Sequence, residues 1–375
     1  MADISMRAMK TATLQNPVIK QLPRELCDSK SSLDNARIGM IYPRRGDGSN
    51  WPWISRIGPM SQWAFESYSV DNVFAPFPKA TWLYRKLQFS QIAQQIKSCD
   101  LTFLFSTDIA VALAYKLAKQ NSNTSLIYVG FTQDGSWPAK KVRKIARSLK
   151  RCEVVTMFSE QERKVYINRF TLSPQQAVVI PIHTDEINNY SEYSDHAPEP
   201  KKYILALGSP NRSFTLTAQI CKKLGLPLVI ITRPWHTTDS LSQLASLGAK
   251  IITNADKLKA LTYLKHAKLA VMPFVDDSVA SGFTTIMHAM FMRTPIVATQ
   301  CLGVSEHIID GETGFVTPHN HSKSLLNAID RLWSQPGLAQ TFGEAALRRA
   351  EKRHSHTAAA EQFSKLINKT LSLHM

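Results

Sequence analysis

No apolar run in the 375-residue sequence approaches the roughly 20 residues needed to cross a bilayer. The first residues, MADISMRAMKTATLQNP, contain no apolar segment of the kind found in secretion signals. The five cysteines form no C-x-x-C pair and show no zinc-ligand spacing, so we expect reduced thiols and no metal site. These absences favour a cytoplasmic protein, either free or peripheral on the inner face of the cytoplasmic membrane.

Two common phosphate-binding motifs, the Walker A motif with its lysine and the G-x-G-x-x-G fingerprint, are also missing. The nearest approach is the turn PRRGDGSNW at 43–51. Gly46 and Gly48 let the backbone approach a ligand there, and Arg45 adds a cation. This segment is either a binding loop of the first domain or an ordinary tight turn.

Acidic residues are scarce in the first half of the chain. Residues 1–180 carry 25 Lys and Arg against 13 Asp and Glu, whereas residues 181–375 carry 20 against 16. The densest basic stretch, KKVRKIARSLKR, begins at Lys140 and ends at Arg151, with apolar residues at helical spacing. Such a helix can lie on an anionic membrane surface, or it can be a solvated helix packed by its apolar stripe. Because no aromatic residues are interleaved with the cations, we expect no nucleic-acid partner.

Short β-rich runs alternate with helical patterns, which is typical of parallel sheets covered by helices. We expect strands at 36–43, 101–107, 125–131, 152–159 and 177–182, and then at 203–209, 227–233, 249–254, 268–274 and 294–300. The polar stretch 183–202 between the two sets reads HTDEINNYSEYSDHAPEPKK and is typical of a linker.

The pattern therefore predicts an α/β fold with two doubly wound Rossmann-like domains that face a central cleft. The predicted divisions are an irregular extension at 1–36, a first domain at 37–184, a linker at 185–202, a second domain at 203–350 and a C-terminal helix at 351–375. A break near Ser355 would let that last helix cross back to the first domain.

Two turns of the second domain carry the residues of an anion site. One turn leads into a predicted helix at 286–292 and contains Ser281, Gly282, Phe283, Thr284 and Thr285. Small and hydroxyl residues at a helix start leave N–H groups that favour an anion. The other turn, GSPNRSF, follows the domain's first strand and offers Gly208 and Arg212. Together the two loops would form a diphosphate clamp; simple capping of the helix is the alternative.

Three phrases then occur in order: VVTMFSEQERKVYINRFTLSPQQAVVIPIHTD (154–185), YILALGSPNRSFTLTAQ (203–219) and SGFTTIMHAMFMRTPIVATQCLGVSEHIIDGETGFVTP (281–318). They resemble the GT-B glycosyltransferases, in particular the large retaining family of bacterial sugar transferases (group 1, family 4 type). The resemblance implies that the second domain binds a nucleotide-diphosphate sugar and that the first domain binds the acceptor. It also implies a reaction with retention of configuration and without a metal cofactor.

The sequence departs from that family at its usual pair of glutamates. Counting back from Pro295, the glutamate that holds the nucleotide ribose falls on His288, and the other falls on Ala280 or near Ser281. His288 can exchange hydrogen bonds with ribose hydroxyls, or it is a helix histidine without a ligand role. The donor-binding set that the resemblance implies is Gly208, Arg212, Asn254, Leu258, Ser281, Gly282, Phe283, Thr284, Thr285 and His288.

Three residues are assigned to catalysis by the same resemblance. Arg212 would neutralise the leaving diphosphate, and Asp277 would accept a sugar hydroxyl unless the pair Asp276-Asp277 only forms a turn. Asp134 lies in the loop after 125–131, where the family often carries a histidine. We therefore expect a hexosyltransferase acting on a glycan, glycolipid or other hydroxyl acceptor. A nucleotide-sugar 2-epimerase of the same fold and a non-catalytic binding protein are the alternatives.

Overall fold

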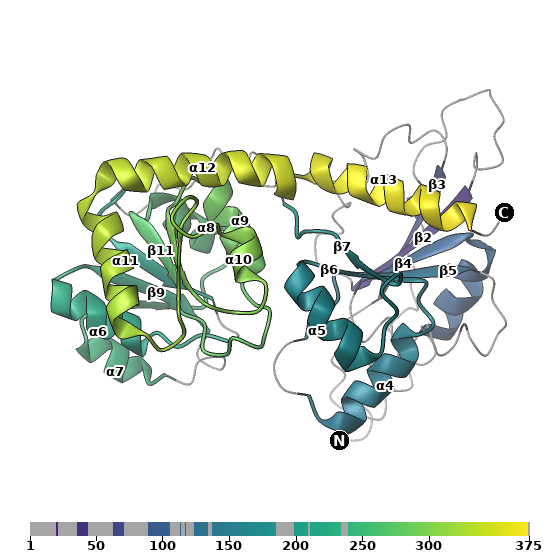
Figure 1. Cartoon of the computed structure of the whole chain (residues 1–375), viewed down its shortest axis with the longest axis horizontal. Helices are drawn as coiled ribbons and strands as arrows, with labels where there is room; N and C mark the ends of the chain where they lie inside the picture. The colour runs from purple at the N-terminus through teal and green to yellow at the C-terminus, as the bar shows by residue number, and fades with distance from the viewer. Residues whose placement is uncertain are drawn as a thin grey trace, which may run out of the picture.

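The computed structural model shows two sheet-based domains side by side, with two long C-terminal helices running along one side of both (Figure 1). The residues that it describes are 20–21, 36–43, 63–70, 89–105, 113, 117, 124–133, 137–184, 199–208, 211–233 and 239–373.

The first sheet has seven strands in the order β1-β3-β2-β4-β5-β6-β7, and every pair is parallel except β1 with β3. Its strands are β1 (Lys20–Gln21), β2 (Ala36–Pro43), β3 (Trp63–Val70), β4 (Leu101–Phe105), β5 (Ser125–Val129), β6 (Val154–Met157) and β7 (Ala177–Val179). The five expected strands are confirmed, whereas β3 was not predicted, and neither was the two-residue β1 within the extension expected to be irregular. All five residues of β4 are buried, as expected for a parallel strand covered on both faces.

Helical residues of this domain are described at 89–95, which continue into η3 (Ile96–Ser98), and in α4 (Ala139–Leu149) and α5 (Glu160–Phe170). Helix α5 begins at Ser159, whose side chain accepts a hydrogen bond from the Glu162 N–H, and it ends at Thr171 in the left-handed conformation. The helix expected at 108–120 lies largely outside the described residues; within it Leu113 and Leu117, one turn apart, are both buried.

The second sheet has six parallel strands in the order β10-β9-β8-β11-β12-β13. They are β8 (Ile204–Leu207), β9 (Leu228–Thr232), β10 (Lys250–Thr253), β11 (Leu269–Met272), β12 (Ile296–Thr299) and β13 (Phe315–Thr317). The accompanying helices are α6 (Thr215–Leu224), α7 (Leu241–Ser246), α8 (Lys257–His266), α9 (Phe283–Phe291), α10 (Val304–His307) and α11 (Ser322–Ser334). All expected strands of this domain are confirmed, and their parallel order gives the α/β fold predicted from the alternating pattern.

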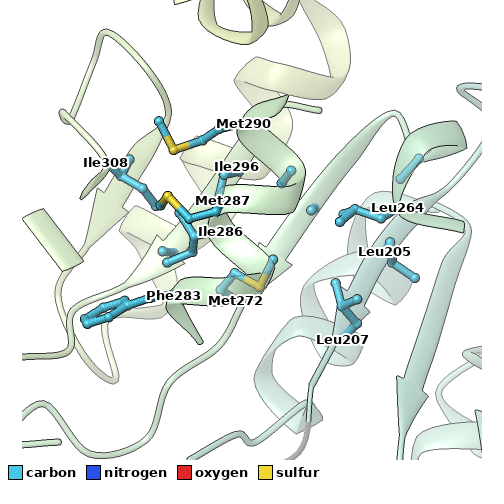
Figure 2. Close-up of a cluster of buried hydrophobic side chains, with 14 of the residues drawn as sticks. Leu205, Leu207, Leu264, Met272, Phe283, Ile286, Met287, Met290, Ile296 and Ile308 are labelled. Atoms are coloured by element: carbon cyan, nitrogen blue, oxygen red, sulfur yellow. The ribbon is translucent and has the colours of Figure 1, made fainter. Parts of the chain in front are cut away.

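Helix α9 is anchored in the core of the second domain. Figure 2 shows Phe283, Ile286, Met287 and Met290 of this helix packed with Met272 of β11 and other buried side chains. Ile286, Met287 and Met290 are fully buried, and burial of each such side chain contributes about 1.5–3 kcal/mol. The start of α9 therefore occupies a fixed place relative to the strands.

The last two helices, α12 (Pro336–His354) and α13 (His356–Ser372), meet at Ser355. Ser355 has extended backbone angles, which break the helix, and its side chain accepts a hydrogen bond from the Ala358 N–H at 3.2 Å. Helix α12 packs on the second domain, whereas α13 packs on the first sheet (Figure 1). Phe363 of α13 contacts Phe103 edge-on, with ring centroids 5.8 Å apart. One continuous segment thus links both domains.

Buried histidines fill the junction between the domains. His354 Nδ1 lies 2.8 Å from the Ile182 carbonyl, and the His354 carbonyl accepts a hydrogen bond from the Thr184 N–H at 2.8 Å. The His307 and His354 rings lie 5.3 Å apart. Burial lowers the pKa of His354 to about 3, so this histidine is neutral at neutral pH. Across the described ranges no three His, Cys, Asp or Glu side chains cluster as metal ligands, and none of the helices is long and apolar enough to span a membrane.

Candidate functional site

The second sheet reverses its winding between β8 and β11. Strand β8 pairs with β9 on one side and with β11 on the other, so the chain crosses over in opposite directions from this point. In open parallel sheets, ligands bind outside the carboxyl ends of the strands at such a point. The loop that starts with Gly208 follows β8, and the segment that leads to Gly282 follows β11. The structure thus brings together the two turns that the sequence singled out.

Asn211 ties these two segments together. Its side-chain oxygen accepts hydrogen bonds from the Val275 N–H at 3.2 Å and the Asp276 N–H at 2.8 Å. Its Nδ2 donates to the Asp276 carbonyl at 3.0 Å, and the Ser213 N–H donates to the Pro273 carbonyl at 3.1 Å. Asn211 has a φ of 56°, a left-handed conformation that asparagine adopts more readily than most residues. These bonds fix the loop after β8 against the segment after β11.

Arg212 lies between the two segments and is only 3% exposed. Its guanidinium carbon lies 4.0 Å from the centroid of the Phe274 ring. Its Nη1 donates to the Ser281 hydroxyl at 3.3 Å and to the Asn211 carbonyl at 3.3 Å. Burial lowers the pKa of Arg212 to about 10, which still leaves the group protonated at neutral pH. A buried positive charge is therefore held beside the start of α9.

Glycine is needed where the backbone closes around this guanidinium. Gly282 has a φ of 75°, and a Cβ there would overlap Nη2 of Arg212 and lie 2.9 Å from the Phe274 ring. Gly208 has a φ of 117°, and its Cβ would lie 3.2 Å from Arg212 Nε. In the described structure no side chain caps α9 at Gly282. The first N–H groups of α9 and the positive end of its dipole are thus available to an anion.

The predicted donor residues of α9 share one helix face. Ser281, Thr284, Thr285 and His288 follow each other at helical spacing. Ser281 and Thr285 are half-buried, Thr284 is exposed, and His288 is 7% exposed. The role of His288 at the ribose stays a prediction, as do those of Thr284 and Thr285 at the donor.

The acidic pair after β11 divides into two different environments. Asp276 Oδ1 accepts hydrogen bonds from the Ser278 N–H at 2.9 Å and the Ser278 hydroxyl at 2.6 Å. The Asp276 carboxylate therefore stabilises the turn, which is the structural alternative stated for this pair. Asp277 is exposed beside it, and its role toward a sugar hydroxyl stays a prediction.

Two residues of the predicted donor set lie away from Arg212. Asn254 follows β10 with a φ of 59°, and Leu258 is 40% exposed in the first turn of α8. Because β10 is an outer strand separated from β8 by β9, neither residue belongs to the cluster around the guanidinium.

On the first domain, aromatic side chains hold the chain where it leaves β5. Gly130 has a φ of 68°, and a Cβ there would lie 2.7 Å from the Phe158 ring. The next residue, Phe131, packs 5.2 Å from Tyr166, and the Gln133 N–H donates to the Tyr166 hydroxyl at 3.0 Å. The predicted residues Arg45, Gly46, Gly48 and Asp134 lie outside the described residues.

The sequence did not single out Asp239. Its side chain makes the start of α6 different from the start of α9. Its carboxylate accepts hydrogen bonds from the Phe214 N–H at 2.6 Å, the Ser213 hydroxyl at 2.9 Å and the Thr215 hydroxyl at 2.8 Å. The start of α6 is therefore already occupied by a negative group, unlike the start of α9. No sequence motif indicates this contact, because Asp239 lies beyond β9 and reaches α6 only through the fold.

The basic stretch 140–151 forms helix α4. Ile145 and Leu149 are buried in the first domain, so the apolar stripe packs inward. Lys141 lies over the Trp137 ring at 4.1 Å from its centroid. The other cations of the stretch are exposed: Lys140, Arg143, Lys144, Arg147, Lys150 and Arg151. The helix therefore presents charge, and not apolar side chains, to its surroundings.

Residues 214–335 match the family model described as Glycosyl transferases group 1. The chain is 34% identical over 79 residues to an alpha-D-kanosaminyltransferase of Streptomyces kanamyceticus, covering 21% of this chain and 20% of that protein. It is 28% identical over 199 residues to the lipopolysaccharide core biosynthesis mannosyltransferase LpcC of Rhizobium leguminosarum bv. viciae, covering 47% of this chain and 56% of that protein. The chain thus spans about a fifth and about half of these relatives.

The fold is also that of a solved glycosyltransferase from Rickettsia africae ESF-5, which superposes with a TM-score of 0.63 at 17% identity, covering 90% of this chain and 99% of that chain. Anabaena HepE in complex with UDP and glucose superposes with a TM-score of 0.68 at 15% identity, covering 89% of this chain and 100% of that chain. The resemblance to GT-B glycosyltransferases of group 1 that the three sequence phrases indicated is thereby confirmed, as is the two-sheet α/β architecture.

Replacing Gly282 with alanine tests whether the backbone must close on Arg212. The control is Gly225→Ala at the end of α6, where φ is 64° and nothing lies within 4 Å of the added Cβ. We expect Gly225→Ala to lower the free energy of unfolding by about 1 kcal/mol, the cost of a left-handed alanine. Gly282→Ala should cost about 2 kcal/mol more, because it must also displace a buried guanidinium. Urea unfolding measures both, and equal losses would contradict the packing argument.

Proposed function

We propose that the chain is a glycosyltransferase of the hexosyltransferase type, which moves a sugar from a nucleotide-diphosphate sugar to a hydroxyl of a glycan or glycolipid. The observation that carries the proposal is the buried Arg212 beside the uncapped start of α9, at the point where the sheet reverses its winding. Helix α9 lies inside the stretch that matches Glycosyl transferases group 1. The HepE complex with UDP and glucose supports a nucleotide diphosphate as the donor part.

The chemistry proposed for this site is mainly electrostatic. As the bond between the anomeric carbon and the diphosphate oxygen breaks, negative charge collects on the leaving diphosphate. The first N–H groups of α9, the dipole of that helix and the Ser281 hydroxyl face that charge. Because Arg212 is buried beside Ser281 and Gly282, we propose that it acts by orienting Ser281 and through its field at short range. No metal ion and retention of configuration are part of the proposal, on the basis of the family resemblance.

A donor panel scored by thermal unfolding tests the proposed function. If a nucleotide diphosphate binds the folded chain, a free ligand concentration of 100 times its Kd should raise the free energy of unfolding by about 2.7 kcal/mol. We expect one nucleotide to raise Tm most, and its sugar conjugate to yield a glycoside when an acceptor is present. Conversion of the donor to its 2-epimer without acceptor would identify an epimerase instead. Absence of binding to every nucleotide diphosphate in calorimetry would favour a protein without this activity.

The ribose-binding role of His288 is tested by two substitutions. His288→Ala should weaken binding of the nucleotide diphosphate about tenfold, because one or two hydrogen bonds to the ribose are lost. His288→Glu restores the residue that the family usually carries and should bind at least as tightly as the native chain. His321, which caps α11 through the Ser324 N–H, supplies the control His321→Ala. Unchanged affinity in His288→Ala would show that the histidine only fills space in α9.

We further propose that the exposed cations of α4 dock the protein on an anionic membrane surface, where a lipid-linked acceptor would be presented. Each Lys or Arg near such a surface contributes about 1 kcal/mol, and salt screens the attraction. The buried Ile145 and Leu149 leave this interaction purely electrostatic.

Vesicle sedimentation measures this docking directly. We expect binding to vesicles with anionic lipid at low salt, and release at high salt. The triple variant Lys140→Ser, Lys144→Ser, Arg147→Ser should lose most of it. The variant Lys222→Ser, Lys223→Ser, Lys250→Ser, at exposed positions of α6 and β10 in the second domain, is the charge-matched control. Failure of the native chain to sediment at low salt would refute the docking.

A further inference from the structure

Two helix starts, one from each domain, bond to each other across the domain boundary. The first turn of α5 in the first domain has three N–H groups without a partner inside the helix. The Glu306 carboxylate of α10, in the second domain, accepts from two of them: the Glu160 N–H at 2.9 Å and the Gln161 N–H at 2.8 Å. The third, on Glu162, donates to the Ser159 hydroxyl at 3.1 Å. All three donors at this end of α5 are therefore satisfied.

The contact is reciprocal, because α5 also completes the start of α10. Gln161 Oε1 accepts a hydrogen bond from the N–H of Gly303, the residue before α10, at 2.9 Å. Gly303 has a φ of 84°, and a Cβ there would lie 2.5 Å from the Ser159 hydroxyl. The backbones at the two helix starts thus approach as closely as a glycine allows.

The charges at this contact favour the paired state. The Glu306 carboxylate lies at the positive end of the α5 dipole, where a negative group is stabilising. Glu162, the buried neighbour, would repel a second carboxylate if it were ionised. Burial raises the pKa of Glu162 to about 8, although hydrogen bonds from Ser159 and Phe158 oppose this. The raised pKa favours the neutral form of the Glu162 carboxyl at neutral pH, which reduces that repulsion.

The contact is connected to the proposed donor site by short steps. Phe283, the first residue of α9, lies between the His307 ring of α10 at 4.3 Å and the Phe158 ring of the first domain at 6.5 Å. The Cys301 thiol, in the segment before α10, donates to the Ser281 carbonyl at 3.8 Å. Arg349 of α12 holds α10 from the other side, donating to the Glu306 carbonyl at 2.6 Å. A shift of α10 would therefore move the start of α9 relative to the first domain.

We propose that Glu306 is a positioning residue, whose carboxylate caps α5 and thereby holds the donor-side turn of α9 against the acceptor-side domain. It does not touch the donor. Nucleotide binding is completed within the second domain, so loss of the carboxylate should leave that binding intact and slow the transfer between domains. The kinetic part of this inference rests on the proposed function; the structural part does not.

The test compares Glu306→Ala, Glu306→Gln and Gln161→Ala with the control Glu351→Ala, an exposed glutamate on α12. Spin labels at Lys144→Cys on α4 and Lys223→Cys on α6 report the distance between the domains, since the four described native cysteines are buried. We expect Glu306→Ala to broaden that distance distribution and to lower kcat about tenfold, with the Kd for nucleotide diphosphate within twofold of the native value. Glu306→Gln retains one acceptor and should recover part of both losses.

Gln161→Ala removes the reciprocal bond from the other domain and should produce a smaller change in the same direction, even if Glu306→Ala fails to fold. A native distance distribution and native kcat in all three variants would overturn the inference. A loss of affinity for nucleotide diphosphate as large as the fall in kcat/KM would also overturn the inference, because Glu306 would then act on donor binding. If the native chain transfers no sugar, the proposed function fails, and the distance distributions alone decide the role of Glu306.

Discussion

The site is organised around one buried charge, the guanidinium of Arg212. A cation that is 3% exposed costs free energy unless its surroundings replace water. Here the face of Phe274, the Ser281 hydroxyl and the Asn211 carbonyl do so. Because the group needs all of these at short range, the loop after β8 and the start of α9 must lie at fixed positions. Gly208 and Gly282 follow from the same requirement, since a side chain at either would press on Arg212.

Helices α6 and α9 of the second domain differ in whether their N-terminal ends are available to a ligand. At the start of α6, the Phe214 N–H and the hydroxyls of Ser213 and Thr215 donate to Asp239, so a negative side chain already lies at the positive end of this helix. Helix α9 begins at a left-handed glycine without a side-chain cap, with a buried cation beside it. An anionic ligand gains from the second arrangement and not from the first.

The domains are joined by contacts that differ in kind. Along one side, α12 and α13 form an almost continuous helical segment, in which α12 packs on the second domain and α13 on the first sheet (Figure 1). At the junction, the buried and neutral His354 contacts the Ile182 carbonyl and accepts from the Thr184 N–H. Between α5 and α10, a carboxylate and a side-chain amide make further directed bonds, to backbone N–H groups at two helix starts. The packing of α12 and α13 tolerates small shifts, whereas directed hydrogen bonds specify one arrangement. This is the physical basis for assigning a positioning role to Glu306.

Much of the fold follows from local patterns in the sequence. Strands such as β2 and β9 are short β-rich runs, and the break at Ser355 follows from a residue that caps the next helix better than it continues the last. Strand β3 was missed because WAFESYSV does not alternate regularly in polarity and lies beside stretches without clear periodicity. The phrase SGFTTIMH indicated an anion-binding helix start, because small and hydroxyl residues precede the helical run.

The sequence by itself thus determined the order of strands and helices, the two turns with anion-binding residues and the family resemblance, because these depend on residues near each other in the chain. Tertiary structure alone decided which charges are buried and which helix start is already occupied. Arg212 meets Ser281 across 69 residues, and Glu306 meets Glu160 across 146. Such contacts depend on strand order and on how two domains dock, and neither is encoded in the spacing of residues along the chain.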